Sequence, residues 1–578
     1  MNHASSALLI LKLPVWRGRV VLGLLLLSFA TLVGRSLYLQ GLNNEFLRSK
    51  GDARSSRVIE LSAHRGMITD RWGEPLAIST PVASICATPV DVSFEPGKEK
   101  ALAKLLGMNV PELQKRLEDY KREFVYIKRQ LPPEVAAQAM QLGIPGVFLQ
   151  REYRRYYPAG EVLSHVLGFT GVDDNGQEGL ELSYQNWLAG KPGSRRVIKD
   201  RLGHIIEDVE SIRVPEQGRD LALSIDLKIQ YLAYRELEKA VTEHKAKAGG
   251  IVILDARTGE LLALANMPTY NPNNRGKMNP DRRRNRVVTD LFEPGSTMKP
   301  FTAAAGLESG LFKPGSTIQT SPGHFSIGPA TIHDAHPEGL LTVSQIIQRS
   351  SNIGAAKMAL AMSPEYMWNM FNHAGFGSVP HTGFPGEASG KLRPFKTWLP
   401  IEQATMSYGH GISVSLLQLA RAYTVFANDG ALLPVTMIKQ DMGSVPQAVF
   451  SATTARSVRD MLELVVQAGG TAPRARVAGY RVAGKTGTAH KRDANGGYGG
   501  DRYVASFVGL APASDPRLII AVMIDEPSDG QYYGGAVAAP VFSSVMSGAL
   551  RMLSVPPDAP LTDTILPPES VPEVKEVV

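Results

Sequence analysis

The sequence predicts an α+β protein, in which an antiparallel sheet with helices on both faces follows an extended α+β module and one N-terminal transmembrane helix. Residues 20–34 form a charge-free apolar run, and residues 41–220 carry short strand-like runs separated by turn sequences. Residues 221–555 show a strand hairpin, a helical block, three strands and a helix. That order is typical of helices packed on the faces of an antiparallel sheet.

Size and composition indicate a multi-domain globular protein. With 578 residues, 43% of them hydrophobic and 20% charged, the chain is long enough for several cores. The single cysteine, Cys86, cannot form an intrachain disulfide and is expected to be a buried apolar side chain. The basic cluster Arg282, Arg283, Arg284 and Arg286 lacks interleaved aromatic residues. We therefore interpret it as a solvated or ion-paired surface and expect no nucleic-acid partner.

The N-terminal apolar run is short for a membrane span. A helix over 20–40 reaches spanning length if Arg35 extends towards the lipid headgroups. A removable signal peptide has a similar pattern, but no small-x-small cleavage sequence follows the run, so we expect an uncleaved anchor. Basic residues precede any acidic residue, which favours a cytoplasmic tail over 1–19 and places the chain after residue 40 outside the cytoplasm.

Residues 41–220 are predicted to form an extended module without a catalytic constellation. Turn sequences such as DRWGEP and DDNGQEG separate its strand-like runs, while Lys98–Leu142 is predicted to be helical. The polar join at 214–220 separates this module from a second domain over 221–555 that opens with an amphipathic helix. The Pro-rich tail 556–578 is predicted to be disordered.

The stretch GYRVAGKTGTA, from Gly479 to Ala489, satisfies the P-loop pattern G-x-x-x-x-G-K-[ST]. A P-loop requires a buried strand before its glycines and a helix that begins at the Lys-Thr pair. Here a Gly- and Pro-containing segment precedes the pattern, and a Gly- and Asn-rich segment that cannot propagate a helix follows it. We therefore expect no ATP site and interpret LIIAVMIDE, from Leu518 to Glu526, as a sheet strand.

A first candidate for covalent chemistry is Ser296-Thr297-Met298-Lys299, at a predicted helix start. A spacing of i to i+3 places the Ser hydroxyl and the Lys amine on one helix face, with Cβ atoms about 5–6 Å apart. A hydroxyl becomes nucleophilic when a neighbouring base takes its proton. A Lys amine can be that base when burial, another cation or a helix N-terminus lowers its pKa. Alone, S-x-x-K is equally consistent with an N-cap serine and a surface lysine.

Two further motifs follow in the chain. Ser350-Ser351-Asn352 supplies a hydroxyl and an amide where two predicted helices meet. Lys485-Thr486-Gly487-Thr488 lies on a predicted strand edge, where its ammonium and hydroxyl groups can bind a carboxylate and Gly487 lets a peptide backbone approach. The order S-x-x-K, S-x-N, K-T-G is the signature of penicillin-recognising serine acyltransferases.

Nearly the whole chain resembles the class B penicillin-binding proteins, and within them the septal D,D-transpeptidases of Gram-negative cell division, the penicillin-binding protein 3 group. The segments that carry this resemblance include AHRGMITDRWGEPLA, RRYYPAGEVLSHVLGFTG, QEGLELSY, PTYNPNNR, RNRVVTDLFEPGSTMKPF, YGHGISVSLLQLARAY and YYGGAVAAPVF. The resemblance implies a transpeptidase domain of the serine β-lactamase type over 221–555 and a dimerisation-type pedestal over 41–220. It also implies a single-pass protein of the bacterial inner membrane with a periplasmic catalytic domain.

The resemblance further implies a two-step acyl transfer. Ser296 would attack the penultimate D-Ala carbonyl of a D-Ala-D-Ala stem peptide, or a β-lactam, while Lys299 takes its proton. The backbone amides of Ser296 and Thr488 would hold the oxyanion. Ser350 would relay the proton to the departing D-Ala, and Asn352 would orient the substrate amide. An amine from a neighbouring peptidoglycan strand would then take the acyl group. The implied substrate-binding residues are Lys485, Thr486, Gly487, Thr488, Tyr408, His410, His490, Tyr503, Tyr532 and Tyr533.

Two positions depart from the relatives of this group, in which an aromatic residue follows Tyr408-Gly409 and an arginine follows K-[ST]-G-T-A. This chain has His410 and His490 there. We therefore expect a paralogue of the housekeeping division enzyme, with altered β-lactam affinity or pH response, because histidine titrates near neutrality.

Other activities are also consistent with parts of the sequence. A D,D-carboxypeptidase differs only in admitting water instead of an amine. A β-lactamase of class A needs an added Glu, and the nearest look-alike, Glu365, lies in a predicted amphipathic helix where we interpret it as structural. His333-Asp334-Ala335-His336 has ligand-type residues but no evident third ligand group, so no metal or other cofactor is expected. Motifs of a glycosyltransferase domain are lacking, and the resemblance implies a polytopic, FtsW-like glycosyltransferase of the division machinery and other divisome proteins as partners.

Overall fold

The computed structural model describes residues 15–42, 56–120, 122, 124–199, 205–276, 279–440, 443, 445–491 and 501–560. The start of the predicted cytoplasmic tail and most of the predicted C-terminal tail lie outside these residues. The chain divides into two compact units. The first unit contains Met1–Ala63, Pro81–Tyr153 and Lys191–Glu216, and the second contains His64–Thr80, Arg154–Gly190 and Gln217–Val578.

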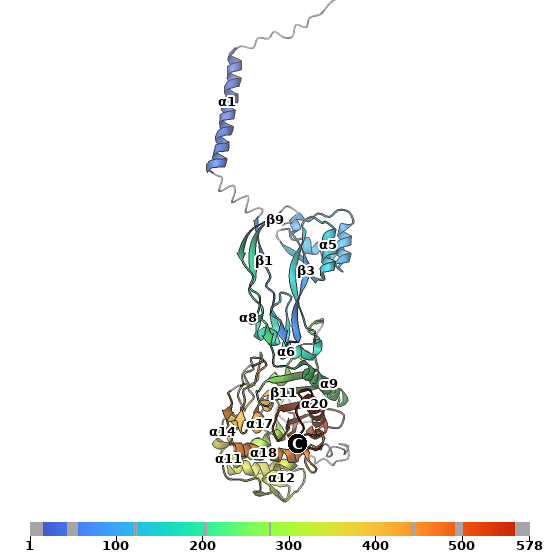
Figure 1. Cartoon of the computed structure of the whole chain (residues 1–578), viewed down its shortest axis with the longest axis vertical. Coiled ribbons are helices and arrows are strands. Elements are labelled where there is room, and N and C mark those ends of the chain that lie inside the picture. Colours follow the sequence, from blue (N-terminus) through green and yellow to red (C-terminus); the bar gives the residue numbers. More distant parts are fainter. Residues whose placement is uncertain are drawn as a thin grey trace, which may run out of the picture. The chain divides into compact units, whose positions relative to one another are not determined.

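The N-terminal helix α1, Val15–Leu37, continues into a π-helical turn at Tyr38–Leu42 (Figure 1). Among the residues that the structure describes, Val15–Gly41 is the one helix long and apolar enough to cross a membrane. None of the α1 side chains is buried in the protein. The predicted apolar helix is confirmed, although it begins at Val15 rather than at residue 20.

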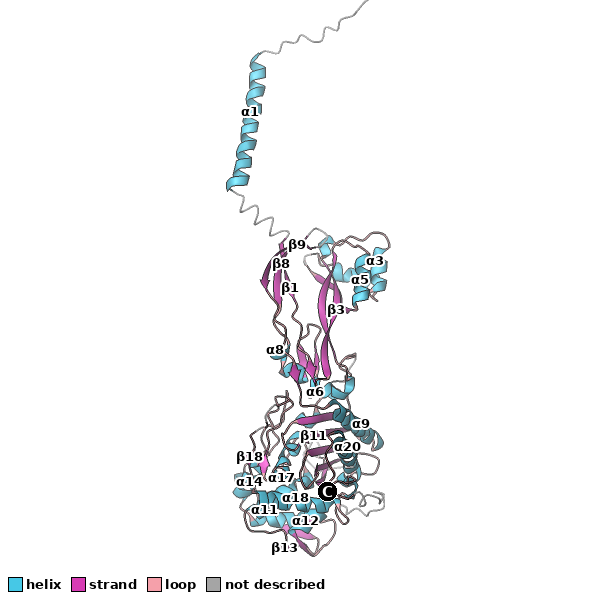
Figure 2. Ribbon diagram, viewed as in Figure 1, coloured by secondary structure: helices cyan, strands magenta, loops and turns pink. Residues whose placement is uncertain are grey.

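The first unit contains an antiparallel sheet of three strands in the order β1-β8-β9 (Figure 2). These strands are β1 at Ser56–Leu61, β8 at Gly193–Lys199 and β9 at Ile205–Arg213. Both strand pairs are antiparallel, as turn-separated runs predict.

A small core in the first unit is formed by α3 (Lys98–Leu105), α4 (Val110–Leu117), α5 (Pro133–Gln141) and the strand β4 (Val125–Leu131). The prediction of helix throughout Lys98–Leu142 is therefore wrong. In β4 the side chains at the first and third positions are buried and the one between them is half-buried. This period of two belongs to a strand and overrides the helix-forming composition of the surrounding sequence.

The main sheet of the second unit is antiparallel and has the order β12-β11-β21-β20-β19. Its strands are β11 (Ala248–Asp255), β12 (Leu261–Met267), β19 (Ala483–His490), β20 (Tyr503–Ala511) and β21 (Leu518–Asp525). The predicted hairpin is β11-β12, and the three predicted later strands are β19, β20 and β21. Because β19 is last in the order, one of its edges lies open beside the helical block.

Helices cover both faces of this sheet, as predicted. A Cβ on Gly249 would contact Val241 of α9 (Leu227–Glu243), whereas a Cβ on the next residue, Gly250, would contact Val287 of α10 (Arg286–Thr289). Successive strand residues point to opposite faces, so α9 and α10 lie on opposite sides. Helix α20 (Ala539–Met552) packs beside α9 (Figure 1).

Eight further helices form a block between β12 and β19. They are α11 (Lys299–Glu308), α12 (Val343–Arg349), α13 (Asn352–Ala361), α14 (Pro364–His373), α15 (Pro400–Met406), α16 (Leu416–Ala422), α17 (Thr424–Ala427) and α18 (Ala452–Val466). Phe301 of α11 is fully buried, with its ring centroid 4.9 Å from that of Phe376 and 5.5 Å from that of Tyr423. These edge-to-face contacts fix α11 within the core.

A buried ion network joins three segments of the second unit that carry the family resemblance. Glu181 lies between Arg65 and Arg155, with an N–O distance of 2.6 Å to each, and all three side chains are at most 1% exposed. A carboxylate shared by two guanidinium groups offsets the cost of burying the charges. The sequence has no local signal for this network, because Arg65 and Glu181 are 116 residues apart.

His165 is a buried titratable group in the same unit. Its ring packs edge-to-face on Tyr270, with centroids 5.4 Å apart, and its Nε2 lies 2.8 Å from the Arg282 carbonyl oxygen. Burial lowers the pKa of His165 from 6.5 to about 4. Between these pH values the unfolded chain binds more protons than the folded chain, so folding stability falls as the pH drops from 6.5 towards 4.

We expect His165→Gln to remove this pH dependence, because glutamine can donate to the Arg282 carbonyl but does not titrate. Through this group the wild type should lose about 3 kcal/mol between pH 6.5 and 4. As the pH falls from 6.5 to 4, the thermal midpoint of the wild type should therefore drop further than that of the variant. The variant is needed because Asp174, whose pKa burial raises to about 6, acts with the opposite sign in this range. Parallel pH profiles of the two proteins would contradict the prediction.

Candidate active site

Ser296 lies in a 3-10 turn, Gly295–Met298, that leads directly into α11, so the predicted helix start is confirmed. Gly295 has a φ of +58°, and a Cβ there would lie 3.2 Å from the Thr488 carbonyl oxygen. A Cβ on Gly409 would lie 2.2 Å from the Gly295 carbonyl oxygen. Glycine at both positions lets three backbone segments meet beside the serine.

Three side chains from separate elements meet Ser296 in a hydrogen-bonded chain. The Lys299 Nζ lies 3.0 Å from the Ser296 Oγ and 3.0 Å from the Ser350 Oγ. The Lys485 Nζ donates to the same Ser350 Oγ at 2.9 Å. Both lysine side chains are 0% exposed. The alternative interpretation of S-x-x-K, as an N-cap serine with a surface lysine, is therefore wrong.

Ser350 owes its position to a sharp junction between two helices. It is the C-cap of α12 in the left-handed region, with φ +61° and ψ +40°, and Ser351 is the N-cap of α13. The Ser351 Oγ accepts from the Gly354 amide at 2.9 Å. The predicted meeting of two helices at S-x-N is confirmed.

Asp334, from the segment after β15 (Ala330–His333), caps the same junction. Its carboxylate accepts from the Ser351 hydroxyl, from the Asn352 amide at 2.6 Å and from the Ile353 amide at 3.0 Å. The Asn352 Nδ2 donates to the His333 carbonyl at 3.2 Å. An anion at the start of α13 satisfies two otherwise unpaired amides and opposes the positive end of the helix. In the sequence Asp334 stands only within a group of metal-ligand residue types, and no local pattern predicts its capping role.

Lys485, Thr486, Gly487 and Thr488 all lie on the edge strand β19, as predicted. The strand continues through them to His490, so no helix begins at the lysine and the P-loop interpretation is excluded. The Thr486 Oγ1 lies 2.7 Å from the Thr471 Oγ1, and the Thr488 Oγ1 accepts from the Gly534 amide at 3.1 Å. These contacts orient the hydroxyl groups of both motif threonines.

Packing within the protein leaves room only for glycine at position 487. A Cβ there would lie 2.5 Å from the Ser506 Oγ and 2.7 Å from the Pro294 carbonyl oxygen. The motif predicts that this glycine lets a substrate backbone approach. In the structure its immediate neighbours are the adjacent strand and the segment that precedes the serine.

The predicted aromatic and histidine residues form two separate groups. Tyr408 is 7% exposed and packs in a small core cluster, with the His410 ring 5.3 Å away. The second group is a row of rings that starts at the end of β19, where His490 pairs with Tyr503 of β20. Its centroid separations are 4.5 Å for His490–Tyr503, 4.1 Å for Tyr503–Tyr532 and 4.5 Å for Tyr532–Tyr533.

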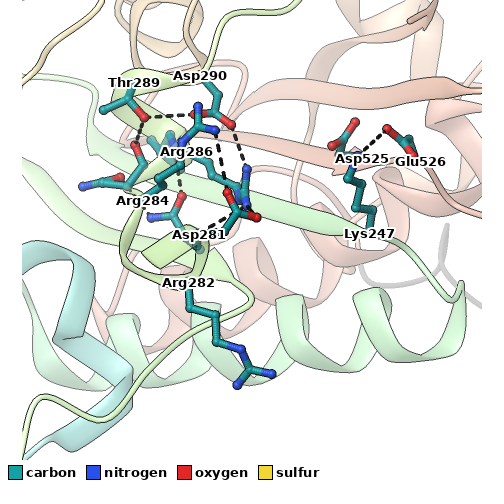
Figure 3. A network of polar contacts seen from close by, with 12 residues as sticks. Lys247, Asp281, Arg282, Arg284, Arg286, Thr289, Asp290, Asp525 and Glu526 are labelled. Atoms are coloured by element: carbon teal, nitrogen blue, oxygen red, sulfur yellow. Dashed lines mark hydrogen bonds and ion pairs between the residues drawn. The ribbon is translucent and has the colours of Figure 1, made fainter. Parts of the chain in front are cut away.

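The sequence allows either a solvated or an ion-paired surface for the arginine cluster at 282–286. In the structure Arg284 and Arg286 are ion-paired. Arg284 contacts Asp290 at 2.6 Å, and Arg286 contacts Asp281 at 2.9 Å and Asp290 at 3.0 Å. Figure 3 shows these side chains turned towards one another, with Arg282 extending away from them. Across the described residues, no group of three or more His, Cys, Asp or Glu side chains could hold a metal ion, and the motif His333–His336 forms none.

A family model described as the penicillin-binding protein transpeptidase domain matches residues 249–547, and one described as the penicillin-binding protein dimerisation domain matches residues 60–223. The chain belongs to the penicillin-binding proteins. The serine, the two lysines and S-x-N that meet in the structure all lie inside the first match.

This penicillin-binding protein is 45% identical to the probable peptidoglycan D,D-transpeptidase PenA of Neisseria gonorrhoeae over 94% of each chain. It is 42% identical to the peptidoglycan D,D-transpeptidase FtsI of Escherichia coli K12 over 94% of this chain and 93% of that one. A solved structure of the TP domain of Burkholderia pseudomallei penicillin-binding protein 3 matches at 51% identity with a TM-score of 0.55. That match covers 58% of this chain and 98% of the other.

In this penicillin-binding protein we expect Asp334→Asn to slow acylation by a labelled penicillin about tenfold. The amide keeps one acceptor oxygen but removes the charge that holds the start of α13, worth about 1 kcal/mol. Acylation rates from stopped-flow measurements and thermal midpoints should be compared with those of His336→Asn, a change nearby that leaves the cap intact. Equal acylation rates for wild type and Asp334→Asn would contradict the prediction.

Proposed function

We propose that this chain is a peptidoglycan D,D-transpeptidase that crosslinks stem peptides during septal cell-wall synthesis through an acyl-enzyme on Ser296. The observation that carries the proposal is the hydrogen-bonded chain from Ser296 through Lys299 and Ser350 to Lys485. It unites a nucleophile, a base within reach and a route for the proton.

In the first step the Ser296 Oγ attacks the carbonyl carbon of the penultimate D-Ala, and Lys299 takes the hydroxyl proton. Two buried ammonium groups that share the Ser350 hydroxyl repel each other, which favours the neutral amine on one of them. The backbone amides of Ser296 and Thr488 hold the developing oxyanion. The close backbone approach at Gly295 supports this pairing of amides, because it brings the two segments together.

The peptide C–N bond then breaks and an ester to Ser296 remains. Ser350, in contact with both lysines, passes a proton to the nitrogen of the departing D-Ala. Asn352 orients the substrate amide, and Lys485, Thr486 and Thr488 bind the terminal carboxylate. An amine of a neighbouring strand attacks the ester, forms the crosslinking amide and returns the serine hydroxyl. A β-lactam follows the first step alone and leaves its acyl group on the serine.

The same proposal includes the cellular setting. Helix α1 anchors the chain in the bacterial inner membrane, with residues 1–19 in the cytoplasm and the 41–220 pedestal and 221–555 transpeptidase domains in the periplasm. An FtsW-like glycosyltransferase of the division machinery supplies the glycan strands. Similarity to FtsI over 94% of this chain supports this setting. His410 and His490 support a specialised paralogue of the division enzyme with altered β-lactam affinity.

Incubation of the full-length protein with a labelled penicillin should give one adduct, located on Ser296 by mass spectrometry of proteolytic fragments. Ser296→Ala should give none, because the nucleophilic oxygen is absent. Thr297→Ala is the matched control. The Thr297 hydroxyl donates to the Pro294 carbonyl at 2.8 Å and is not the nucleophile, so this variant should still be acylated on Ser296. An adduct on a residue other than Ser296, or an adduct that still forms in Ser296→Ala, would contradict the mechanism. Products from a D-Ala-D-Ala peptide with and without an added amine distinguish transpeptidation from carboxypeptidation.

The acylation rate should depend on the side chain at position 490. An arginine there, as in the relatives, carries a fixed charge that can pair with the carboxylate of a penicillin, so His490→Arg should acylate about tenfold faster than the wild type at pH 8. Stopped-flow rates with one penicillin provide the test. Equal rates for the two proteins would remove altered β-lactam affinity from the paralogue proposal.

A further inference from the structure

Residues 526–533, which follow β21 and are called the tyrosine loop below, carry two of the predicted substrate-binding residues, Tyr532 and Tyr533. The Tyr532 ring is stacked on that of Tyr503 with an interplanar angle of 12°, and the Tyr532 hydroxyl lies 3.3 Å from that of Tyr533. After the tyrosines the chain packs closely, because a Cβ on Gly534 would lie 2.3 Å from a carbonyl oxygen of β20. The position of the two rings therefore depends on how the start of the loop is held.

The start of the tyrosine loop is held against the connection between α9 and β11. Ser528 donates twice, from its amide to the His244 carbonyl at 2.9 Å and from its hydroxyl to the Lys245 carbonyl at 2.8 Å. Lys247 contacts the Glu526 carboxylate at 3.0 Å (Figure 3). These contacts follow from the sheet order, because β11 and β21 are paired and the α9–β11 connection lies beside the end of β21.

A further contact, three residues before Tyr532, joins His244 and Asp529. The His244 Nδ1 lies 2.8 Å from the Asp529 Oδ2, and the two side chains are 17% and 21% exposed. The second carboxylate oxygen, Oδ1, accepts from the Gln531 amide at 3.0 Å. One carboxylate therefore connects the end of α9 to the turn that leads directly into Tyr532.

The charge of Asp529 determines the direction of this contact. Burial acts to raise the pKa of Asp529, but the hydrogen bonds from His244 and from the Gln531 amide outweigh burial and hold the pKa below its usual value. The carboxylate is therefore ionised near neutral pH and can only accept, so the imidazole donates from Nδ1. Hydrogen bonds to an ionised carboxylate are stronger than those between neutral groups.

Helix α9 does not need the His244 side chain for its own termination. Its end is a Schellman motif, with Lys245 in the left-handed region at a φ of +47°. The Lys245 amide donates to the Thr242 carbonyl at 3.2 Å. The Ala246 amide donates to the Val241 carbonyl at 2.9 Å. Backbone groups thus satisfy the carbonyls at the helix end, and the His244 side chain serves the tyrosine loop.

We infer that His244 is a positioning residue for the ligands of the active site. Through Asp529 it holds the tyrosine loop in the conformation that keeps the Tyr532 ring stacked on Tyr503. The inference rests on the proposed function and on the predicted role of these two tyrosines in substrate binding. A ring that is held in place before binding loses less freedom on binding, so the contact strengthens ligand affinity and leaves the acylation step at Ser296 unchanged.

Acylation of the full-length protein in detergent by a fluorescent penicillin tests the inference. The dependence of the acylation rate on penicillin concentration gives the dissociation constant of the non-covalent complex and the limiting rate. His244→Ala should raise the dissociation constant about fivefold, the upper end for a partly exposed ion pair, and leave the limiting rate unchanged. His244→Asn should stay within about twofold of the wild type, because its Nδ2 can donate to Asp529.

Glu243→Ala is the matched control, because Glu243 precedes His244 on α9 and its carboxylate contacts Lys239 of the same helix at 3.9 Å. It should bind the penicillin like the wild type. A double variant separates positioning of the ring from a general loss of structure. In Tyr532→Ala, which lacks the ring that His244 holds, the addition of His244→Ala should change the dissociation constant by less than about 1.5-fold.

A wild-type dissociation constant for His244→Ala, or a further loss of about fivefold when it is added to Tyr532→Ala, would overturn the inference. A His244→Asn protein that binds as weakly as His244→Ala would also contradict it. Failure of the proposed function gives a different result, because the wild type itself would then carry no adduct on Ser296.

Discussion

Two buried lysine side chains that share the Ser350 hydroxyl impose the main constraint on this structure. Lys299 comes from α11, Lys485 from β19 and Ser350 from the α12–α13 junction. An ammonium group without water is tolerated only where hydrogen bonds replace its hydration. Three elements far apart in the sequence must therefore hold their positions to within the length of a hydrogen bond.

Much of the surrounding structure serves that positioning. The aromatic contacts of Phe301 fix α11, and the left-handed conformation of Ser350 turns the chain sharply between two helices. Asp334 lies in a loop outside the three catalytic motifs. Its carboxylate stabilises the turn by accepting from the Asn352 and Ile353 amides. At Gly487, β19 packs against the segment that precedes Ser296. The contact is so close that a Cβ on residue 487 would not fit. The site is rigid because each of its segments is held by contacts that substrate does not supply.

Charge pairing organises the second unit in two further places. Glu181 neutralises Arg65 and Arg155 in the core, and the Arg286–Asp290 pair lines a cavity beside the active site. In both places each of these charges has a partner within the protein, which offsets the cost of its burial.

The sequence by itself determined the apolar anchor, the antiparallel sheet with helices on both faces, and the order of three motifs on a helix start, a helix junction and a strand edge. These features depend on residues close together in the chain, where periodicity and turn residues are decisive. The strand β4 was missed because helix-forming residues surround its short alternating pattern. Only the tertiary structure decided that Asp334 caps the start of α13 and that Glu181 joins two arginines. Each of these depends on contacts between distant segments, whose spacing no local pattern encodes.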